Sequence, residues 1–129
     1  MGTRSLTYVF EGDQPILCLY RQYDGYVAGH GREVAEFLRG NKVVNGLSLN
    51  PERVFNGMGC LAASLVAHFK TAPGGFYIHA PVLGRDDWQD YEYHIYKDKI
   101  RVIKCYDKEV IFLGSWESFV EFCSVEETV

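Results

Sequence analysis

The sequence predicts an α+β fold in which about three helices cover one face of a single antiparallel β-sheet. Near the N-terminus, two strand-like runs are joined by a short polar turn. Near the C-terminus, three further runs are separated by two residues each, and such short turns force consecutive strands to pair antiparallel. The 129 residues are expected to form one domain, 1–129, because a chain of this length normally builds a single core.

The first two strands are predicted at residues 4–10 and 15–22. In the first run, Leu6, Tyr8 and Phe10 point to one face, and the second run is largely apolar. The residues between them, EGDQ, are suited to the turn of a β-hairpin. The N-terminal part of the sheet is therefore expected to be this hairpin.

Two helices are predicted in the middle of the chain. The first has apolar residues at the i, i+3, i+4 spacing of a short amphipathic helix over 34–38, and Gly40 closes it. The second, at 60–70, reads CLAASLVAHFK and is apolar almost all round, which suits a central helix packed closely on a sheet. Residues 41–56 between them are expected to be irregular.

The C-terminal part is predicted to contain most of the sheet. Pro81 ends a short strand, and an acidic loop with one tryptophan, LGRDDWQD, follows at 83–90 and is expected to be exposed. Ser115 is placed to cap a final helix. The strands expected here are 76–80, 91–97, 100–106 and 109–113.

Composition limits the class of protein. A hydrophobic content of 47% excludes a disordered chain, and a net charge of −4 argues against general nucleic-acid binding, which needs a basic face. No apolar run approaches the roughly 20 residues of a membrane span, and the start lacks the layout of a signal peptide. A cytoplasmic location is therefore expected. The cysteines have no CxxC spacing and are expected to be buried, reduced thiols: Cys18, Cys60, Cys105 and Cys123.

The segment YRQYDGYVAGHG, residues 20–31, concentrates polar and aromatic residues at the predicted end of a strand and start of a helix. Its glycines allow close backbone approach, an arginine can hold a phosphate bidentately, and tyrosine rings offer stacking faces. A small nucleotide-derived ligand fits this chemistry. The residues expected to bind it are Arg4, Tyr20, Arg21, Gln22, Tyr23, Asp24, Gly25, Tyr26, Gly29, His30 and Gly31.

Alternatives to each of these interpretations stay open. The alternative for the segment 20–31 is a tight turn, in which Asp24 and Gly25 make a bend and His30 is merely exposed. A second glycine pair before the central helix could also approach a phosphate, or could be a cap followed by small packing residues; it comprises Asn56, Gly57 and Gly59. Arg4 lies at the start of a strand, and the alternative is that it is a solvent-exposed residue with no ligand.

No metal site or cofactor is predicted, because the histidines lack metal-ligand spacing. His79 and His94 lie on predicted strands and could share a face of the sheet, whereas His68 is expected on the flank of the central helix. His30 is the histidine expected to be functional. If the protein is an enzyme, His30 would be the general acid or base, with Asp24 or Glu33 as its partner.

The combination of MGTRSLT, YRQYDGY followed by GHG, GMGCLAASLVAHFK, YEYHIY and SWESFVEFC resembles a family of small uncharacterised proteins of bacteriophages and bacteria. The resemblance covers nearly the whole chain. By analogy, phage-encoded cytosolic domains of this size with an aromatic, arginine-bearing pocket are similar to viral proteins that sequester nucleotide immune signals. This analogy of context and pocket chemistry, which is not a motif match, implies a ligand such as a cyclic ADP-ribose derivative or a cyclic dinucleotide.

Three functions follow from these observations. The first is capture of a small nucleotide-derived molecule by a homo-oligomer that shares its pocket between subunits, because one loop alone gives marginal affinity. The second is an enzyme that cleaves a phosphodiester or glycosidic bond with His30. The third is an inhibitor that contacts a host protein through the acidic loop around Trp88.

Overall fold

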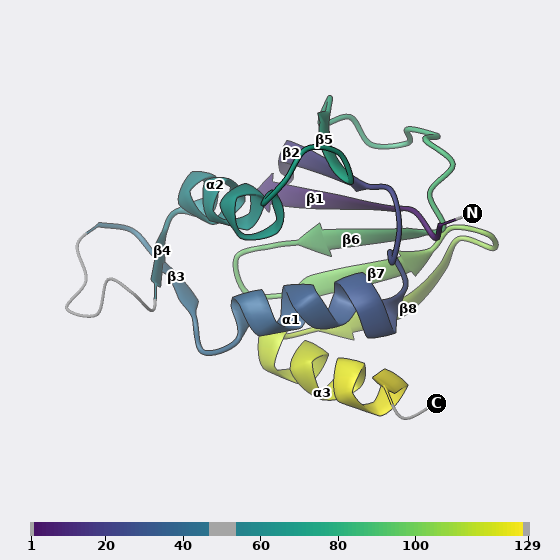
Figure 1. Ribbon diagram of the computed structural model, residues 1–129. Helices are drawn as coiled ribbons and strands as arrows, with labels where there is room; N and C mark the ends of the chain where they lie inside the picture. The colour runs from purple at the N-terminus through teal and green to yellow at the C-terminus, as the bar shows by residue number, and fades with distance from the viewer. Residues whose placement is uncertain (1, 47–53, 128–129) are drawn as a thin grey trace.

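The computed structural model describes residues 2–46 and 54–127 and shows the expected α+β domain (Figure 1). No helix among these residues is both long enough and apolar enough to cross a membrane. In chain order the elements are β1 (Ser5–Glu11), β2 (Gln14–Arg21), the π-helical turn η1 (Val27–Gly31), α1 (Arg32–Leu38), β3 (Lys42–Val44), β4 (Val54–Asn56), α2 (Met58–Phe69), β5 (Phe76–His79), β6 (Tyr91–Ile95), β7 (Ile100–Lys104), β8 (Glu109–Gly114) and α3 (Trp116–Glu127).

The main sheet has six strands in the order β5-β2-β1-β6-β7-β8. The predicted hairpin and the predicted three-strand meander are both confirmed, as β1–β2 and β6–β7–β8. The join between them corrects the expectation of a wholly antiparallel sheet, since β1 and β6 run parallel. The reason is topological: the chain leaves the sheet after β2, returns briefly as β5, and crosses over before β6 begins.

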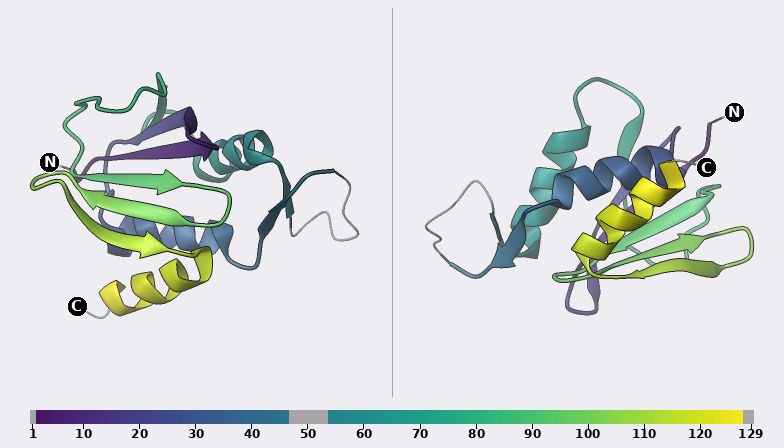
Figure 2. Two further views of the ribbon diagram at one scale, coloured as in Figure 1. Left: turned by 180° about the vertical axis from the view of Figure 1, so that it is seen from behind. Right: turned by 90° about the horizontal axis from the view of Figure 1, so that it is seen from below.

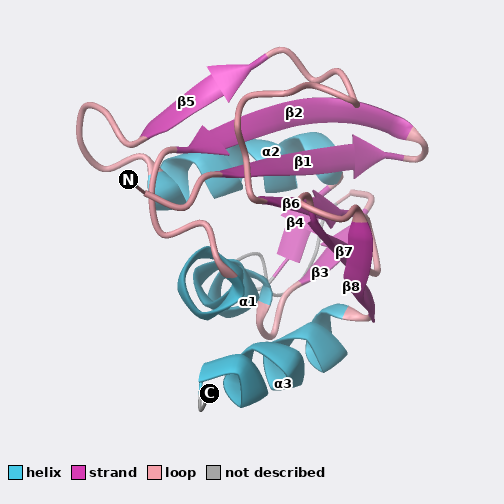
Figure 3. Cartoon of the chain, turned by 90° about the vertical axis from the view of Figure 1, so that its right-hand side faces the viewer, coloured by secondary structure: helices cyan, strands magenta, loops and turns pink. Residues whose placement is uncertain are grey.

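All three α-helices cover one face of this sheet (Figures 1 and 2). Figure 3 shows α2 against β1 and β2, while α1 and α3 lie side by side below the other strands. Their apolar faces and the strands share one large core, which includes the fully buried Leu61, Leu65 and Phe119. α2 packs on the sheet mainly through large side chains, Leu61, Leu65 and Phe69, whereas Ala63 and Ala67 are exposed, which corrects the expectation that its small residues make the contact.

The opposite face of the sheet is covered by the loop that joins β5 to β6. A smaller core of Leu6, Tyr8, Phe10 and Cys18 lies there, and the Tyr8 hydroxyl donates to the carbonyl of Val82 in the loop at 2.8 Å. Both faces of β1 are therefore buried. The expectation that 83–90 is exposed holds for Trp88, whose exposure is 78%, whereas Arg85, Asp87 and Gln89 are partly buried against the sheet.

Two segments have local structure that the sequence analysis did not predict. Within 41–56, β3 and β4 form a separate parallel pair, and residues 47–53 of that segment lie outside the described residues. Residues 27–31 wind into the π-helical turn that leads directly into α1. Such turns are rare and are often found at functional sites.

The positions of the cysteines agree only in part with the prediction, whereas those of His79 and His94 agree with it. All four cysteines are free thiols, but Cys60 is exposed on α2 and Cys105 is only partly buried, which corrects the expectation that every thiol is in the core. His79 and His94 do share one face, because the strand register aligns His79, Cys18, Tyr8 and His94 in a row across four strands.

The core of α2 gives a direct stability test. Leu65→Ala should lower the free energy of unfolding by about 2–5 kcal/mol, because it removes a fully buried side chain from a packed helix–sheet contact. Val125→Ala is the matched control, since Val125 is 65% exposed on α3, and it should change stability by less than about 0.5 kcal/mol. Urea denaturation followed by circular dichroism measures both, and equal effects would contradict this placement of the core.

Candidate functional site

The polar residues of the segment 20–31 divide into a buried half and an exposed half. The buried half centres on Arg21 and His30, which are 6% and 0% exposed. Arg21 Nη1 lies 3.1 Å from His30 Nδ1, and His30 Nε2 lies 2.6 Å from the hydroxyl of Thr7 on β1. These three side chains form a hydrogen-bonded chain inside the domain.

The chain fixes the chemical state of the imidazole. A guanidinium can only donate, so Nδ1 of His30 is the acceptor, and the proton on Nε2 is donated to Thr7. Burial, followed by the nearby charge of Arg21, lowers the pKa of His30 from 6.5 to about 3. His30 is therefore neutral at physiological pH. Its two ring nitrogens are both bonded inside the protein, and its ring packs against Phe69 and Tyr93.

Arg21 spans from the core to the surface. Its guanidinium lies over the Phe76 ring, 4.9 Å from the ring centroid, and it forms an ion pair with Glu33 of α1. The Glu33 side chain is 48% exposed, so the carboxylate keeps part of its hydration while it neutralises the buried cation. Arg21 thus holds β2, η1 and α1 together.

The glycines of this segment approach other parts of the protein. A Cβ at Gly25 would lie 2.8 Å from backbone and side-chain atoms of Arg4 and Ser5, and one at Gly29 would lie 2.6 Å from the carbonyl oxygen of Asp24. The amide of His30 also donates to the Asp24 carbonyl, at 2.8 Å. Only glycine fits these close backbone crossings, which explains the glycines without a ligand.

The exposed half consists of side chains that this scaffold presents to solvent. Tyr23 and Tyr26 are 48% and 42% exposed, and Gln22 and Asp24 are also exposed. Asp24 has a φ of 60°, in the left-handed region, where aspartate is tolerated better than most residues. Gly31 is buried near the Tyr93 ring.

The second glycine pair lies elsewhere. Asn56, Gly57 and Gly59 belong to the end of β4 and the start of α2, at the opposite end of the molecule from η1 (Figure 1). The Asn56 side-chain oxygen accepts from the Gly46 amide at 2.9 Å, and Gly57 has a φ of 85°. The structure therefore does not bring these residues together with segment 20–31.

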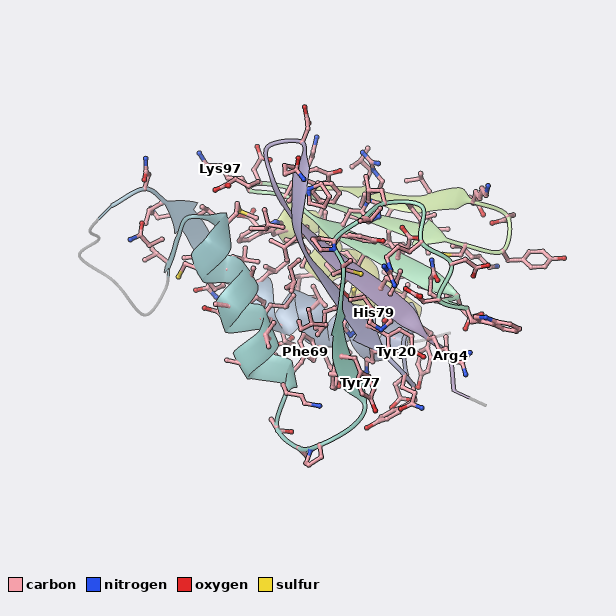
Figure 4. All side chains as sticks on the ribbon, turned by 90° about the horizontal axis from the view of Figure 1, so that it is seen from above. Arg4, Tyr20, Phe69, Tyr77, His79 and Lys97 are labelled. Carbon is pink, nitrogen blue, oxygen red and sulfur yellow. The ribbon has the colours of Figure 1, made fainter. Side chains whose placement is uncertain are left out.

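A cleft with a volume of about 680 Å³ lies on the face opposite the helices. We call it the Trp88 cleft. Figure 4 shows Arg4, Tyr20 and His79 close together at this site, on the ends of β1, β2 and β5. Of the residues expected to bind ligand, only Arg4 and Tyr20 reach it. Its lining is Arg4, Tyr20, His79, Asp86, Asp87 and Trp88.

Hydrogen bonds fix the polar wall of this cleft. His79 Nδ1 lies 3.0 Å from the Asp87 carboxylate, which also accepts from Arg85 Nε at 2.9 Å. The hydrogen bond from Arg85 holds the pKa of Asp87 below its ordinary value. The His79 ring stacks on Tyr20 with 4.8 Å between ring centroids and an interplanar angle of 7°. The cleft thus contains an oriented imidazole on a flat aromatic surface.

The loop holds Trp88 outward. The Gln89 side chain bonds the Arg85 carbonyl and the Asp87 amide, and the Trp88 amide bonds Asp86. Trp88 itself has a φ of 65°, which is uncommon for a bulky side chain and is maintained here by these surrounding bonds. An exposed indole is therefore presented on an ordered loop.

Sequence reasoning missed most of this cleft. The sequence predicts a protein contact for Trp88, and for His79 it predicts only a place on a strand. The signal available was the tryptophan in the otherwise polar run GRDDWQD. No group of three or more His, Cys, Asp or Glu side chains able to hold a metal ion occurs in the described ranges 2–46 and 54–127.

The buried imidazole predicts a pH dependence of stability. Because the folded pKa of about 3 lies below the ordinary 6.5, His30 contributes stability above pH 6.5 that is lost as the pH falls toward 3. At pH 4 the loss relative to pH 7 should be roughly 3 kcal/mol. His30→Gln should remove this pH-dependent component. The free energy of unfolding of the wild type minus that of the variant, measured with urea, should therefore become smaller from pH 7 to pH 4. A constant difference would contradict a neutral, buried His30.

Arg21→Ala should destabilise the fold by at least about 2 kcal/mol, because it removes a buried guanidinium that three elements contact. Arg39→Ala is the control, since its ion pair with Glu36 is exposed and 3.7 Å long, and it should cost less than about 1 kcal/mol. Thermal and urea unfolding test the pair. An Arg21 variant as stable as the parent would place Arg21 in a binding role instead.

No family model, curated protein or solved structure matches the chain. The functional assignment therefore depends on the geometry of the Trp88 cleft and on the chemistry of the residues that line it. That chemistry comprises aromatic faces, one arginine, two carboxylates and one oriented imidazole.

Proposed function

We propose that this protein captures a small nucleotide-derived molecule in the Trp88 cleft and sequesters it. The observation that supports this most is the flat Tyr20–His79 pair and the exposed Trp88 around one cleft of about 680 Å³, a volume within the range of small-molecule sites. Aromatic faces of this kind stack on nucleobases. Arg4, in the same lining, supplies a cation for a phosphate.

The acidic residues of the cleft suit the sugar part of such a ligand. Asp86 is exposed at the cleft, and carboxylate oxygens accept hydrogen bonds from ribose hydroxyls. Asp87 is already paired with Arg85 and hydrogen-bonded to His79, so Arg85 offsets the charge that would repel a phosphate. The Nε atom of Arg4 has no hydrogen-bond partner among the described residues although it is shielded from solvent.

Affinity arithmetic favours a homo-oligomer. Micromolar binding needs about 8 kcal/mol, whereas a stacked base contributes about 1–3 and a charge-assisted hydrogen bond about 1.5–3 kcal/mol before ordering costs. One stacked base and one arginine therefore give only marginal binding. A second subunit that closes the cleft would supply the remainder, and we include this in the proposal.

With the family resemblance, these features support a role as a bacteriophage anti-defence protein in the host cytoplasm, with cyclic ADP-ribose derivatives and cyclic dinucleotides as candidate ligands. The experiment is to incubate the protein with these compounds, remove free ligand, denature the protein and analyse what is released. Intact ligand supports sequestration. No retention contradicts it and favours contact with a host protein through Trp88.

One observation supports an enzyme as the second candidate. Nδ1 of His79 is oriented by Asp87, which leaves Nε2 as the remaining ring nitrogen for acid–base chemistry in the cleft. This arrangement places a hydrolytic role on His79, because His30 has both nitrogens bonded in the core. Release of altered ligand in the same experiment, lost in His79→Gln, would establish this candidate over sequestration.

Trp88→Ala should weaken retention of the captured nucleotide by roughly 10-fold to 100-fold, because it removes one stacking face. Leu113→Ala is the matched control, as Leu113 is 56% exposed on β8 and outside the cleft lining, and it should bind like the parent. Isothermal titration calorimetry with a retained compound measures both affinities. Unchanged affinity in the Trp88 variant would refute this cleft as the binding site.

A further inference from the structure

A second concave site lies on the other side of the N-terminal segment. It consists of two adjoining hollows of about 330 and 260 Å³ that share Tyr26, Tyr91 and Lys104. We call the joined hollows the Lys104 trough. Thr3 lines the trough whereas Arg4 lines the Trp88 cleft, so consecutive residues separate the two sites.

The fold fixes the tyrosines of the trough. Tyr26 precedes the π-helical turn, and a Cβ at Gly29 would lie 3.1 Å from its ring, so the ring packs directly on that glycine. Tyr91 lies on β6 opposite Lys104 of β7, and its ring is 6.5 Å from that of the buried Tyr93. Segment 20–31 therefore presents Tyr26 at a fixed position beside a cross-strand Tyr–Lys pair.

Lys104 supplies a positive charge for the trough. It is exposed and forms no ion pair with any residue in the ranges 2–46 and 54–127. Two carboxylates also line the trough. Asp90 is occupied by the amide of Arg4 at 3.1 Å, and Glu109 lies opposite Lys104 on β8. The ammonium is thus available to a ligand, while the carboxylates disfavour a ligand with several phosphate groups.

The two ends of the trough differ in character. At one end Tyr106, 95% exposed, offers an aromatic face beside the Thr3 hydroxyl. At the other end apolar side chains lie beside the Glu109 carboxylate, and they include Val27, Ile111 and Phe122. A ligand that matches this pattern carries one anionic group for Lys104 and the tyrosine hydroxyls, and one flat ring for Tyr106.

We propose that the Lys104 trough is a second binding site, for a nucleoside monophosphate or a similar aromatic phosphate, and that it works independently of the Trp88 cleft. The phosphate contacts Lys104 and the hydroxyls of Tyr26 and Tyr91, and the base stacks on Tyr106. This inference does not require the Trp88 cleft to bind anything.

The test is a titration of ¹⁵N-labelled protein with AMP and with inorganic phosphate, followed by ¹H–¹⁵N NMR. AMP should shift the amide signals around Tyr26, Tyr91 and Lys104, and it should bind at least 5-fold more tightly than phosphate. Lys104→Gln should weaken the AMP affinity measured from these signals at least 10-fold, because it removes the positive charge while keeping an unbranched polar side chain.

Two controls separate the trough from the cleft. Lys97→Gln removes an exposed lysine from the turn after β6, away from Arg4 in Figure 4, and should bind AMP like the parent. Trp88→Ala should also leave the trough signals and their AMP affinity unchanged, even where it abolishes capture in the cleft. Trough signals that stay still up to millimolar AMP, an undiminished affinity in Lys104→Gln, or equal affinities for AMP and phosphate would each overturn the proposal.

Discussion

The fold around segment 20–31 depends on one buried contact, in which a guanidinium donates to an imidazole and the imidazole donates to a threonine. Arg21, His30 and Thr7 come from β2, η1 and β1, so a single hydrogen-bonded chain joins the first hairpin to the turn that starts α1. A buried cation is costly unless it is paired, and the ion pair with Glu33 of α1 meets that requirement at the surface. The polar residues that suggest a ligand, Arg21 and His30, are thus bonded to other side chains of the protein.

Because these buried side chains cannot reach a ligand, binding is left to the two concave sites on the surface. The helix layer covers one face of β1 and the 80–90 loop covers the other, so β1 is buried on both faces. The concave sites therefore lie beside its N-terminal end. Arg4 and Thr3 lie side by side in sequence, yet they line different sites. The scaffold therefore presents tyrosines toward one site, and the loop presents Trp88 toward the other.

The sequence predicts the secondary-structure elements that depend on interactions between residues close together in the chain. The hairpin 4–22 follows from alternation, the helix over 60–70 from its apolar composition, and the meander after Tyr91 from short turns. All three elements are confirmed. The parallel β1–β6 pairing and the short β3–β4 pair were missed, because both join segments through non-local contacts that carry no periodic signal. Burial of His30 was missed for a related reason. A glycine-flanked histidine resembles a ligand contact until Thr7 and Arg21 are placed beside it.

The account is tested most directly by the protonation state of His30. Long-range ¹H–¹⁵N NMR of the histidine side chains, recorded from pH 8 to pH 4.5, resolves the two ring nitrogens and follows their titration. We expect His30 to stay neutral with its proton on Nε2 over this whole range, because burial and Arg21 hold its pKa near 3. A His30 that titrates near pH 6.5, or that carries its proton on Nδ1, would contradict the buried hydrogen bonds to Arg21 and Thr7. It would mean that His30 is accessible to solvent and to a ligand.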